Sequence, residues 1–313
     1  MTTSRLKKQS VICLMGPTAS GKTALAVELA KALQGEVVSV DSALIYKDMN
    51  VGTAKPSEAE KQGVAHHLID ILTPDKSYSV ADFVQDVSIC IDDIIKRDKV
   101  PILAGGTMMY FNALQQGISH IPPANKIIRD EISQQIANKG VPALHDELSK
   151  VDVITAARIH PNDHQRVTRA LEVYRSSGKP ISYWHSQKQA PLAYDYHNFA
   201  LMTENRALLH QRIEQRFKQM LEHGLVDEVT QLMESYSLHA DLPSMRCVGY
   251  RQVLGLLNAE YDYESMVSKG IAATRQLAKR QITWIRAWQE LEMLDISDNN
   301  SLQTVLRKVG VTP

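Results

Sequence analysis

Residues 11–23 read VICLMGPTASGKT, an apolar run followed at once by GxxxxGK and a threonine. This pattern is typical of a phosphate-binding loop, in which glycines let backbone N–H groups turn toward an anion. The residues after Thr23 have the spacing of an amphipathic helix, whose N-terminus adds the positive end of its dipole. A buried strand, this loop and a helix in that order predict a site for a diphosphate or a triphosphate.

The loop residues have distinct expected roles at such a site. Lys22 has the length to reach terminal phosphates, and the Thr23 hydroxyl is a candidate ligand for Mg²⁺. A glycine-rich turn without a ligand is the structural alternative. We expect the diphosphate or triphosphate to be bound by Gly16, Pro17, Thr18, Ala19, Ser20, Gly21, Lys22 and Thr23.

Composition describes an ordinary globular chain of 313 residues with 44% hydrophobic and 22% charged residues. Three scattered cysteines exclude a disulfide framework and a zinc site, and no apolar run is long enough to cross a membrane. We therefore expect a cytoplasmic protein, and nothing demands more than a monomer. The formal net charge is zero, but residues 58–98 hold nine acids and four Lys/Arg, whereas residues 269–288 hold five Lys/Arg and no acid. Segregated basic segments are typical either of solvated helix faces or of a nucleic-acid footprint.

Short apolar strands are predicted at 11–15, 36–40 and 100–104, with helical patterns between them. The clearest helix follows a capping box at Ser79 and Asp82. Strands that alternate with helices predict an α/β fold, a P-loop NTPase-like core with a parallel sheet. Ligands of such sheets bind at the carboxyl ends of the strands. The phosphate loop, Asp41 and the sequence Gly105-Gly106-Thr107 all fall at such ends, so we expect them to share one cleft.

Residues 122–195 are predicted to form an all-helical domain inserted into a core made of residues 1–121 and 196–313. Asp152 and Asn162 are predicted N-caps, and Gly140 and Gly178 are predicted helix ends. The chain then returns to the sheet in a strand at 194–201, and a long helix follows at about 264–288. The tail after residue 297 is polar and weakly patterned. The helices expected in the insertion span 125–139, 143–149, 152–159 and 163–177.

Asp41 and Thr107 are the candidate catalytic side chains of the core. An ATPase that performs work needs a strand ending in an acid to hold metal and orient water, yet the third strand ends in Ala104-Gly105-Gly106-Thr107. Group transfer from a bound diphosphate or triphosphate is therefore favoured over hydrolysis. A carboxylate at Asp41 could hold Mg²⁺ through water, cap a loop or act as a base, and without hydrolysis it is free to serve the acceptor. Thr107 has a hydroxyl to donate, although it also suits a helix cap.

Two further patterns have structural alternatives. His66 and His67 are adjacent, so their side chains point apart, and packing or a hydrogen bond near the cleft is favoured over metal binding. Segments 165–169, 246–251 and 279–286 interleave Arg, Gln and aromatic residues, which suits phosphates and stacked bases. Solvated helices with a buried ring are the structural alternative for each segment.

Together these segments resemble the bacterial tRNA dimethylallyltransferase family, also called tRNA isopentenyltransferase. The likeness covers nearly the whole chain and rests on GPTASGKT (16–23), DSALIYKDMNVGTAKP (41–56), HHLID (66–70), AGGTMMYF (104–111), RIHPNDHQRVTRALEVY (158–174), LPSMRCVGYRQ (242–252) and ATRQLAKRQITWIR (273–286). The phosphate loop alone is shared with many kinases, whereas the other motifs in this order are specific to the family.

The resemblance implies transfer of a dimethylallyl group from dimethylallyl diphosphate to the exocyclic N6 amine of the adenosine 3′ to the anticodon, in tRNAs that read codons beginning with U. It implies that the loop holds the prenyl diphosphate with Mg²⁺, and that the inserted domain contacts the anticodon stem-loop. It matches Asp41 to the general base, Thr107 to a cleft threonine and Arg129 to an arginine of the reaction channel. Many members of the family have glutamine where this chain has Leu44. A leucine side chain cannot hydrogen-bond, so the expectation that this position recognises the base by hydrogen bonding is weakened.

The same resemblance matches four segments to tRNA contacts. They are Asp41, Ser42, Ala43 and Leu44; Gln165, Arg166, Val167, Thr168 and Arg169; Arg246, Cys247, Val248, Gly249, Tyr250 and Arg251; and Lys279, Arg280, Gln281, Ile282, Thr283, Trp284, Ile285 and Arg286.

Three other functions remain open from the residues: a small-molecule nucleotide kinase, an RNA-binding protein without activity, and a prenyltransferase acting on free adenine nucleotides. A phosphate loop with intact Lys22 and Thr23 disfavours the second, and the basic-aromatic segments disfavour the third. Arg206, Arg212 and Arg216 are all candidates for a further contact to the diphosphate, and the sequence does not choose among them.

Overall fold

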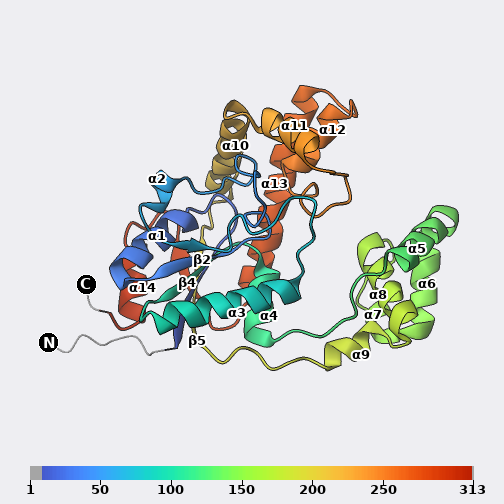
Figure 1. The fold of residues 1–313 in the computed structure, drawn as a ribbon, viewed down its shortest axis with the longest axis horizontal. Coiled ribbons are helices and arrows are strands. Elements are labelled where there is room, and N and C mark those ends of the chain that lie inside the picture. Colours follow the sequence, from blue (N-terminus) through green and yellow to red (C-terminus); the bar gives the residue numbers. More distant parts are fainter. Residues whose placement is uncertain (1–8, 312–313) are drawn as a thin grey trace. The chain divides into compact units, whose positions relative to one another are not determined.

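A computed structural model describes residues 9–311 of the chain. The fold divides into two compact units, a core of Met1–Ala113 with Ala193–Pro313 and an inserted unit of Leu114–Leu192 (Figure 1). The inserted unit therefore begins eight residues before the expected 122 and ends three residues before the expected 195. The reason is backbone pairing: Leu192 N donates to the carbonyl of Leu114, and Ser119 forms an isolated bridge with Lys188. The first and the last segments of the inserted unit are therefore hydrogen-bonded to each other.

The core contains a six-stranded sheet in the order β3-β2-β4-β1-β5-β6, and every adjacent pair is parallel. The predicted parallel sheet is confirmed, and each predicted strand lies within one residue of its observed position. β3 and β6 were not predicted, because β3 has only two residues and β6 only four, of which the first and the last are acidic. The strands are β1 (Ser10–Met15), β2 (Glu36–Val40), β3 (His66–His67), β4 (Pro101–Gly105), β5 (Asp195–Met202) and β6 (Glu292–Asp295).

Helices cover both faces of this sheet. On one face, α1 (Lys22–Leu33) and α14 (Ser301–Lys308) pack on Ile12, Leu14 and Ile102. Strand side chains alternate between faces, so Val11, Cys13 and Met15 point to the other face, where α3 (Val80–Lys96) and α4 (Met108–Gln116) lie. Phe83 of α3 stacks on Tyr110 of α4 with 4.0 Å between ring centroids. The expected capping box at Ser79 is present.

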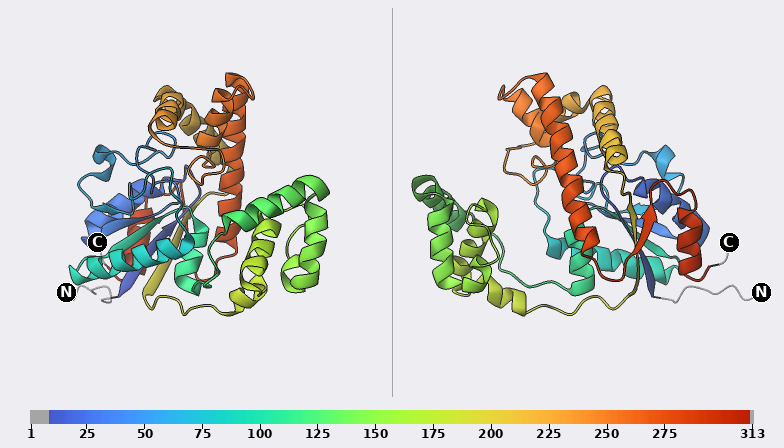
Figure 2. Two further views of the ribbon diagram at one scale, coloured as in Figure 1. Left: turned by 45° about the vertical axis from the view of Figure 1, so that its right-hand side comes forward. Right: turned by 180° about the vertical axis from the view of Figure 1, so that it is seen from behind.

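Beyond the carboxyl ends of the strands, four helices form a second apolar cluster. They are α10 (Arg206–Glu222), α11 (Leu225–Ser235), α12 (Tyr250–Leu257) and α13 (Tyr263–Arg286). α10 packs along α13, the longest of them (Figure 2). Their buried side chains meet Ile45, Tyr46 and Met49 from the segment after β2. This segment, which includes the short helix α2 (Glu58–Lys61), is thereby held above the sheet edge where β1, β2 and β4 end.

The inserted unit consists of five helices around its own apolar core, which includes Leu148, Val167 and Leu171. Asp152 caps a helix as expected, and Gly140 and Gly178 end helices. Asn162 was expected to cap the next helix, but the Asp163 side chain accepts from Arg166 N instead. A carboxylate is favoured at this position because it also interacts with the positive helix end. The helices are α5 (Lys126–Lys139), α6 (Val141–Val151), α7 (Val153–Ala156), α8 (His164–Ser177) and α9 (Ile181–Ser186).

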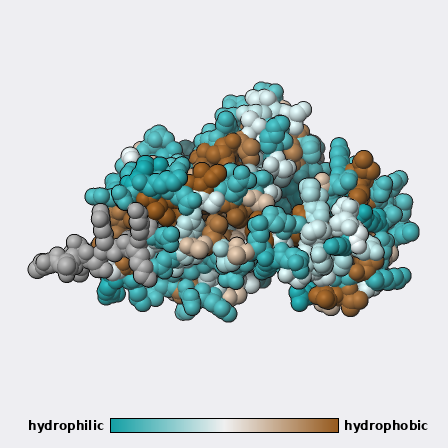
Figure 3. Space-filling view, turned by 60° about the horizontal axis from the view of Figure 1, so that its bottom comes forward, coloured by the Kyte–Doolittle hydropathy of each residue, from teal (hydrophilic) through white to brown (hydrophobic). Residues whose placement is uncertain are grey.

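Hydrophilic side chains cover most of the face drawn in Figure 3, where apolar side chains gather in separate groups. Within residues 9–311, no helix has the length and apolar character needed to cross a membrane.

Candidate functional site

The loop at 16–23 joins β1 to α1, as the sequence predicts, and has the conformation of an anion-binding loop. Gly21 is the N-cap of α1 with φ of 89°, a value that favours glycine. Ala19 also has a positive φ, 63°, which is unusual for a residue with a side chain. A Cβ at Gly16 would lie 2.7 Å from Ser20 Oγ and 3.0 Å from the Leu201 carbonyl. The loop is therefore packed closely at its beginning, where Gly16 follows β1.

The carboxyl ends of three strands meet at one cleft with a volume of about 490 Å³. Lys22 enters it from the phosphate loop, Asp41 from the end of β2, and Thr107 from the turn after β4. Arg216 enters from α10, whereas Arg206 and Arg212 do not line the cleft. The structure thus brings Lys22, Asp41 and Thr107 together and selects Arg216 among the three arginines that the sequence left open.

Of the cations that line this cleft, Lys22 and Arg216 interact with the carboxylate of Asp41. Burial lowers the pKa of Lys22 from 10.5 to about 8, Asp41 raises it, and Arg216 lowers it further. Burial likewise lowers the pKa of Arg216, and its Nε has no hydrogen-bond partner among the described residues. Charges held away from water at this cost are typical of sites that bind an anion or perform chemistry. A diphosphate between Lys22 and Arg216 would supply the missing counter-charge.

Asp41 and Thr107 are held by a set of short polar contacts. Asp41 lines the cleft, and its Oδ1 accepts from Ala43 N at 2.9 Å. Thr107 Oγ1 accepts from Ser42 N at 3.0 Å, and Thr107 N donates to the Val40 carbonyl at 3.1 Å. Thr107 therefore joins the ends of β2 and β4, next to Asp41.

The close approach of these two strand ends depends on a glycine. A Cβ at Gly105 would lie only 2.0 Å from the Val40 carbonyl oxygen. Any side chain at Gly105 would therefore separate the strand that ends at Asp41 from the strand that leads to Thr107.

A smaller cavity of about 50 Å³ lies beside the phosphate loop and is lined by Thr23, Ser39, Asp41 and His66, among others. Ser39 Oγ is buried there without a hydrogen-bond partner in the described part of the chain. Hydroxyl and carboxylate oxygens are the ligands that Mg²⁺ prefers. Thr23, Ser39 and Asp41 would therefore offer oxygen ligands that suit a divalent cation.

The two histidines have separate positions. His67 Nε2 lies 2.6 Å from Glu36 Oε2, at the amino end of β2 and therefore at the opposite end of that strand from Asp41. The favoured hydrogen bond is present for His67, but at the end of β2 away from Asp41, because its partner is Glu36. His66 lines the cavity beside Asp41, and its Nδ1 contacts the Val64 carbonyl at 2.9 Å.

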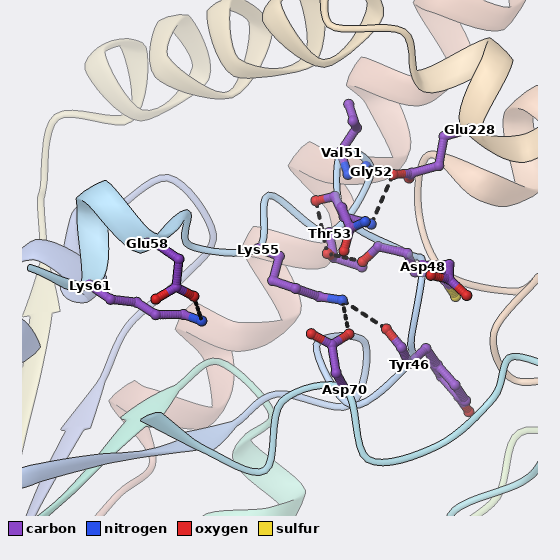
Figure 4. A network of polar contacts seen from close by, with 12 residues as sticks. Tyr46, Asp48, Val51, Gly52, Thr53, Lys55, Glu58, Lys61, Asp70 and Glu228 are labelled. Atoms are coloured by element: carbon purple, nitrogen blue, oxygen red, sulfur yellow. Dashed lines mark hydrogen bonds and ion pairs between the residues drawn. The ribbon is translucent and has the colours of Figure 1, made fainter. Parts of the chain in front are cut away.

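The loop after Asp41 is held by a carboxylate that sequence reasoning missed (Figure 4). Glu228 accepts from the backbone N–H groups of Asn50, Val51 and Gly52, at 2.9, 2.7 and 3.1 Å, and from Tyr250 OH at 2.6 Å. Gly52 also lines the cleft, so Glu228 positions part of its wall. Nothing in the sequence pattern around Glu228 pointed to this role.

A second contact steadies the same loop from its other end. Lys55 donates to the Tyr46 carbonyl at 2.9 Å and also pairs with Asp70 (Figure 4). The family motifs at 41–56 and 66–70 are thereby joined to each other, close to the cleft.

The predicted RNA-contacting segments of the core divide into exposed and buried residues. Arg246, Arg280 and Trp284 are exposed and line the cleft, and the Trp284 side chain is 44% exposed. Tyr250, by contrast, is fully buried, and a Cβ at Gly52 would lie 2.5 Å from its ring. The expectation that the Tyr250 ring is available for stacking on a base is therefore wrong, because the ring packs under the loop after Asp41.

Several other residues of these segments have defined surroundings. Burial and Asp41 raise the pKa of Cys247 to about 12, so its side chain remains a neutral thiol. Gly249 is the N-cap of α12 with φ of 94°. Ile285 is buried, and the exposed members of these segments include Ser42, Arg251, Lys279, Thr283 and Arg286.

In the inserted unit, Glu172 is fully buried and joins two arginines. It accepts from Arg129 at 2.9 Å, from Arg169 at 3.0 Å and from Asn125 N at 2.7 Å. The Arg129 side chain remains 48% exposed, and Arg169 31%. Arg129 therefore lies in the inserted unit and not among the core residues that line the cleft, and its expected role in the reaction channel stays a prediction.

The predicted segment at 165–169 begins α8 of the same unit. Gln165 and Arg166 are exposed, whereas Val167 and Thr168 are buried and pack the helix into its unit. Of the five residues, the exposed pair and Arg169 are the ones placed to meet a partner.

Comparison with known proteins agrees with this arrangement. The family model for "IPP transferase" matches residues 44–288. The chain is similar to the full-length tRNA isopentenylpyrophosphate transferase of Bacillus halodurans, with 36% identity over 96% of this chain and 94% of that one and a TM-score of 0.69. It is also similar to the tRNA delta(2)-isopentenylpyrophosphate transferase of Staphylococcus epidermidis, with 34% identity over 96% and 97% of the two chains and a TM-score of 0.67.

A third similar structure is a eukaryotic dimethylallyltransferase acting on tRNA, with 28% identity over 95% of this chain and 78% of that one and a TM-score of 0.77. A family model that spans most of the chain, and two relatives above 30% identity along nearly all of it, show the family. The chain belongs to the IPP transferase family.

Proposed function

We propose that this protein transfers a dimethylallyl group from dimethylallyl diphosphate to the N6 amine of the adenosine that follows the anticodon, in tRNAs that read codons beginning with U. One observation carries the proposal. Lys22 and Arg216, which suit a diphosphate, line the same cleft as Asp41 and Thr107, which suit an amine acceptor. The family supports the tRNA acceptor and the prenyl donor.

In the proposed reaction, the bond between the allylic carbon and the diphosphate oxygen breaks, and its electron pair leaves with diphosphate. Lys22, Arg216 and the loop amides stabilise that developing charge. The phosphate loop would hold Mg²⁺ through Thr23, with Ser39 and Asp41 nearby. The ion would neutralise further charge on the diphosphate.

The adenine amine forms the new bond to the allylic carbon and loses one proton. Its lone pair is delocalised into the ring, so a carboxylate that accepts the proton assists, typically by about 10²–10⁴-fold. Asp41 is the carboxylate that lines the cleft beside Thr107. The base leaves its stack to enter the cleft, at a cost of a few kcal/mol, and Trp284 offers an exposed ring at the cleft wall.

The inserted unit is proposed to bind the anticodon stem-loop through the exposed Gln165, Arg166, Arg129 and Arg169. The protein would act as a monomer in the cytoplasm.

The test is mass analysis of unmodified tRNA incubated with the protein, Mg²⁺ and dimethylallyl diphosphate, with ATP as the parallel donor. A five-carbon gain on the adenosine beside the anticodon, with the prenyl donor only, supports the proposal. Phosphate transfer from ATP to a small acceptor, without a gain on tRNA, contradicts it.

A further inference from the structure

The side-chain amide of Gln281 in α13 connects two loops that are far apart in the chain. Its Oε1 accepts from Thr18 N in the phosphate loop at 2.9 Å, and its Nε2 donates to the Gly106 carbonyl at 2.9 Å. Both the oxygen and the nitrogen of this amide are thus hydrogen-bonded to backbone groups of the protein itself. It forms a bridge from the phosphate loop to the turn that carries Thr107.

The same face of α13 supports the part of the phosphate loop with unusual backbone geometry. Ala278 and Ile282, which lie three residues before and one after Gln281, form a small apolar cluster with Ala19. Ala19 has φ of 63°, and the left-handed conformation costs an L-residue free energy unless its surroundings impose it. α13 therefore holds Thr18 by a hydrogen bond and Ala19 by apolar packing.

A glycine leaves the space that this bridge needs. A Cβ at Gly106 would lie 2.2 Å from Gln281 Nε2 and 3.2 Å from the Gly16 carbonyl oxygen. A side chain at Gly106 would displace the amide. The next residue, Thr107, is bonded to Ser42 beside Asp41, so the bridge extends from the phosphate loop to the acceptor side of the cleft.

We propose that Gln281 is a positioning residue that sets the conformation of the phosphate loop for its anionic ligand and fixes the Gly106–Thr107 turn against it. The inference rests on the proposed function for the identity of that ligand. It differs from the expectation that Gln281 contacts tRNA, because both ends of the amide bond to the protein itself.

The test measures binding of inorganic diphosphate in the presence of Mg²⁺ and without tRNA, by calorimetry. In Gln281→Met the length and apolar packing are kept, but both hydrogen bonds are lost. We expect diphosphate affinity to fall about tenfold, which corresponds to about 1.4 kcal/mol, and KM for the prenyl donor to rise with it. Affinity for tRNA, measured without donor, is expected to stay within about twofold. Gln276→Met, at an exposed glutamine of the same helix, is the matched control and is expected to change neither affinity.

A second variant reaches the same bridge from the other side. Gly106→Ala is expected to displace the amide and to weaken diphosphate binding to a similar extent. The double variant is expected to lose no more than the larger single loss, because both changes break one bridge. Thermal unfolding of each variant shows whether that variant folds. If Gln281→Met fails to fold, Gly106→Ala still tests the inference.

The possible results separate cleanly. A loss of tRNA affinity with unchanged diphosphate affinity would overturn the inference and make Gln281 an RNA contact. Unchanged affinity for both ligands, or fully additive losses in the double variant, would overturn it as well. A wild-type protein that binds no diphosphate would contradict the proposed function itself, which is a different result.

Discussion

The buried charge of Lys22 leads to a prediction about stability as well as about binding. Burial lowers the pKa of this ammonium from 10.5 to about 8. Each pKa unit corresponds to about 1.4 kcal/mol, so the folded protein disfavours the charged form by about 3 kcal/mol. Lys22→Met removes that charge while it keeps most of the apolar stem. We expect the free energy of unfolding without ligand to rise by about 1–3 kcal/mol. The range extends below 3 kcal/mol because the variant also loses the hydrogen bond from Lys22 to the Pro17 carbonyl.

The assay is thermal unfolding with and without diphosphate and Mg²⁺. Without ligand, Lys22→Met is expected to raise Tm by roughly 1.5–5 °C. With ligand at a hundred times its Kd, the wild type gains about 2.7 kcal/mol, whereas the variant gains almost nothing because it lacks the ammonium. The control is Lys31→Met, at an exposed position of the same helix, which is expected to change stability little and to keep the ligand effect.

The pH dependence gives the same prediction an independent check. Between about pH 8 and 10.5 the unfolded chain holds a proton on Lys22 that the folded protein has released. Lys22 therefore makes the unfolding free energy of the wild type rise with pH across that window. The difference in unfolding free energy between Lys22→Met and the wild type becomes smaller there. A variant that is less stable than the wild type at pH 7, or one that diphosphate still stabilises fully, would refute the reasoning.

Three other changes have defined expectations. Asp41→Asn is expected to keep tRNA affinity while kcat falls about 10²–10⁴-fold, and an equal loss of tRNA binding in filter assays would make Asp41 structural. Glu228→Ala is expected to cost about 1–3 kcal/mol in denaturant unfolding, because it leaves backbone N–H groups unpaired, whereas the exposed Asp227→Ala is the neutral control; equal effects would contradict the role of Glu228. The hydrogen bonds from Lys99, Arg97 and His67 lower the pKa of Glu36 to about 2 against the opposing effect of burial. Glu36 thus contributes stability that is present above about pH 4.5 and lost toward pH 2, about 3 kcal/mol by the same conversion, and a Glu36→Gln variant with the same acid unfolding curve as the wild type would rule this out.

Local patterns were sufficient to predict the sheet and the convergence of its motifs. The apolar run before Gly16, the strand before Asp41 and the strand before Gly105 each carry their own signal, and a parallel sheet brings their ends to one edge. The cleft that contains Lys22, Asp41 and Thr107 follows from that rule. These elements were predictable because each is defined by neighbours in the sequence.

The features that were missed depend on contacts between distant residues. Glu228 holds a loop more than 170 residues away in the chain, and Tyr250 is buried because that loop covers it. β3 has only two residues, too few for a periodic pattern. The helix α14 lies in a polar tail, where Leu302, Val305 and Leu306 are the apolar residues of the helix that pack on the core. Tertiary packing decided these cases, and no local pattern contains that information.

The position of β1 in the sheet has a consequence for how the protein is made. β1 lies between β4 and β5, and Ser10 aligns with Asp195 across the β1–β5 pair. During synthesis one edge of β1 can pair once β4 has emerged, but its other edge waits until the whole inserted unit has been translated. An unpaired strand edge is a template for pairing with other chains. The helices of the inserted unit have their own core and mostly local contacts, which favours rapid folding. We therefore expect the ribosome-bound chain to be most prone to aggregation after residue 105 has emerged and until residue 202 has followed it.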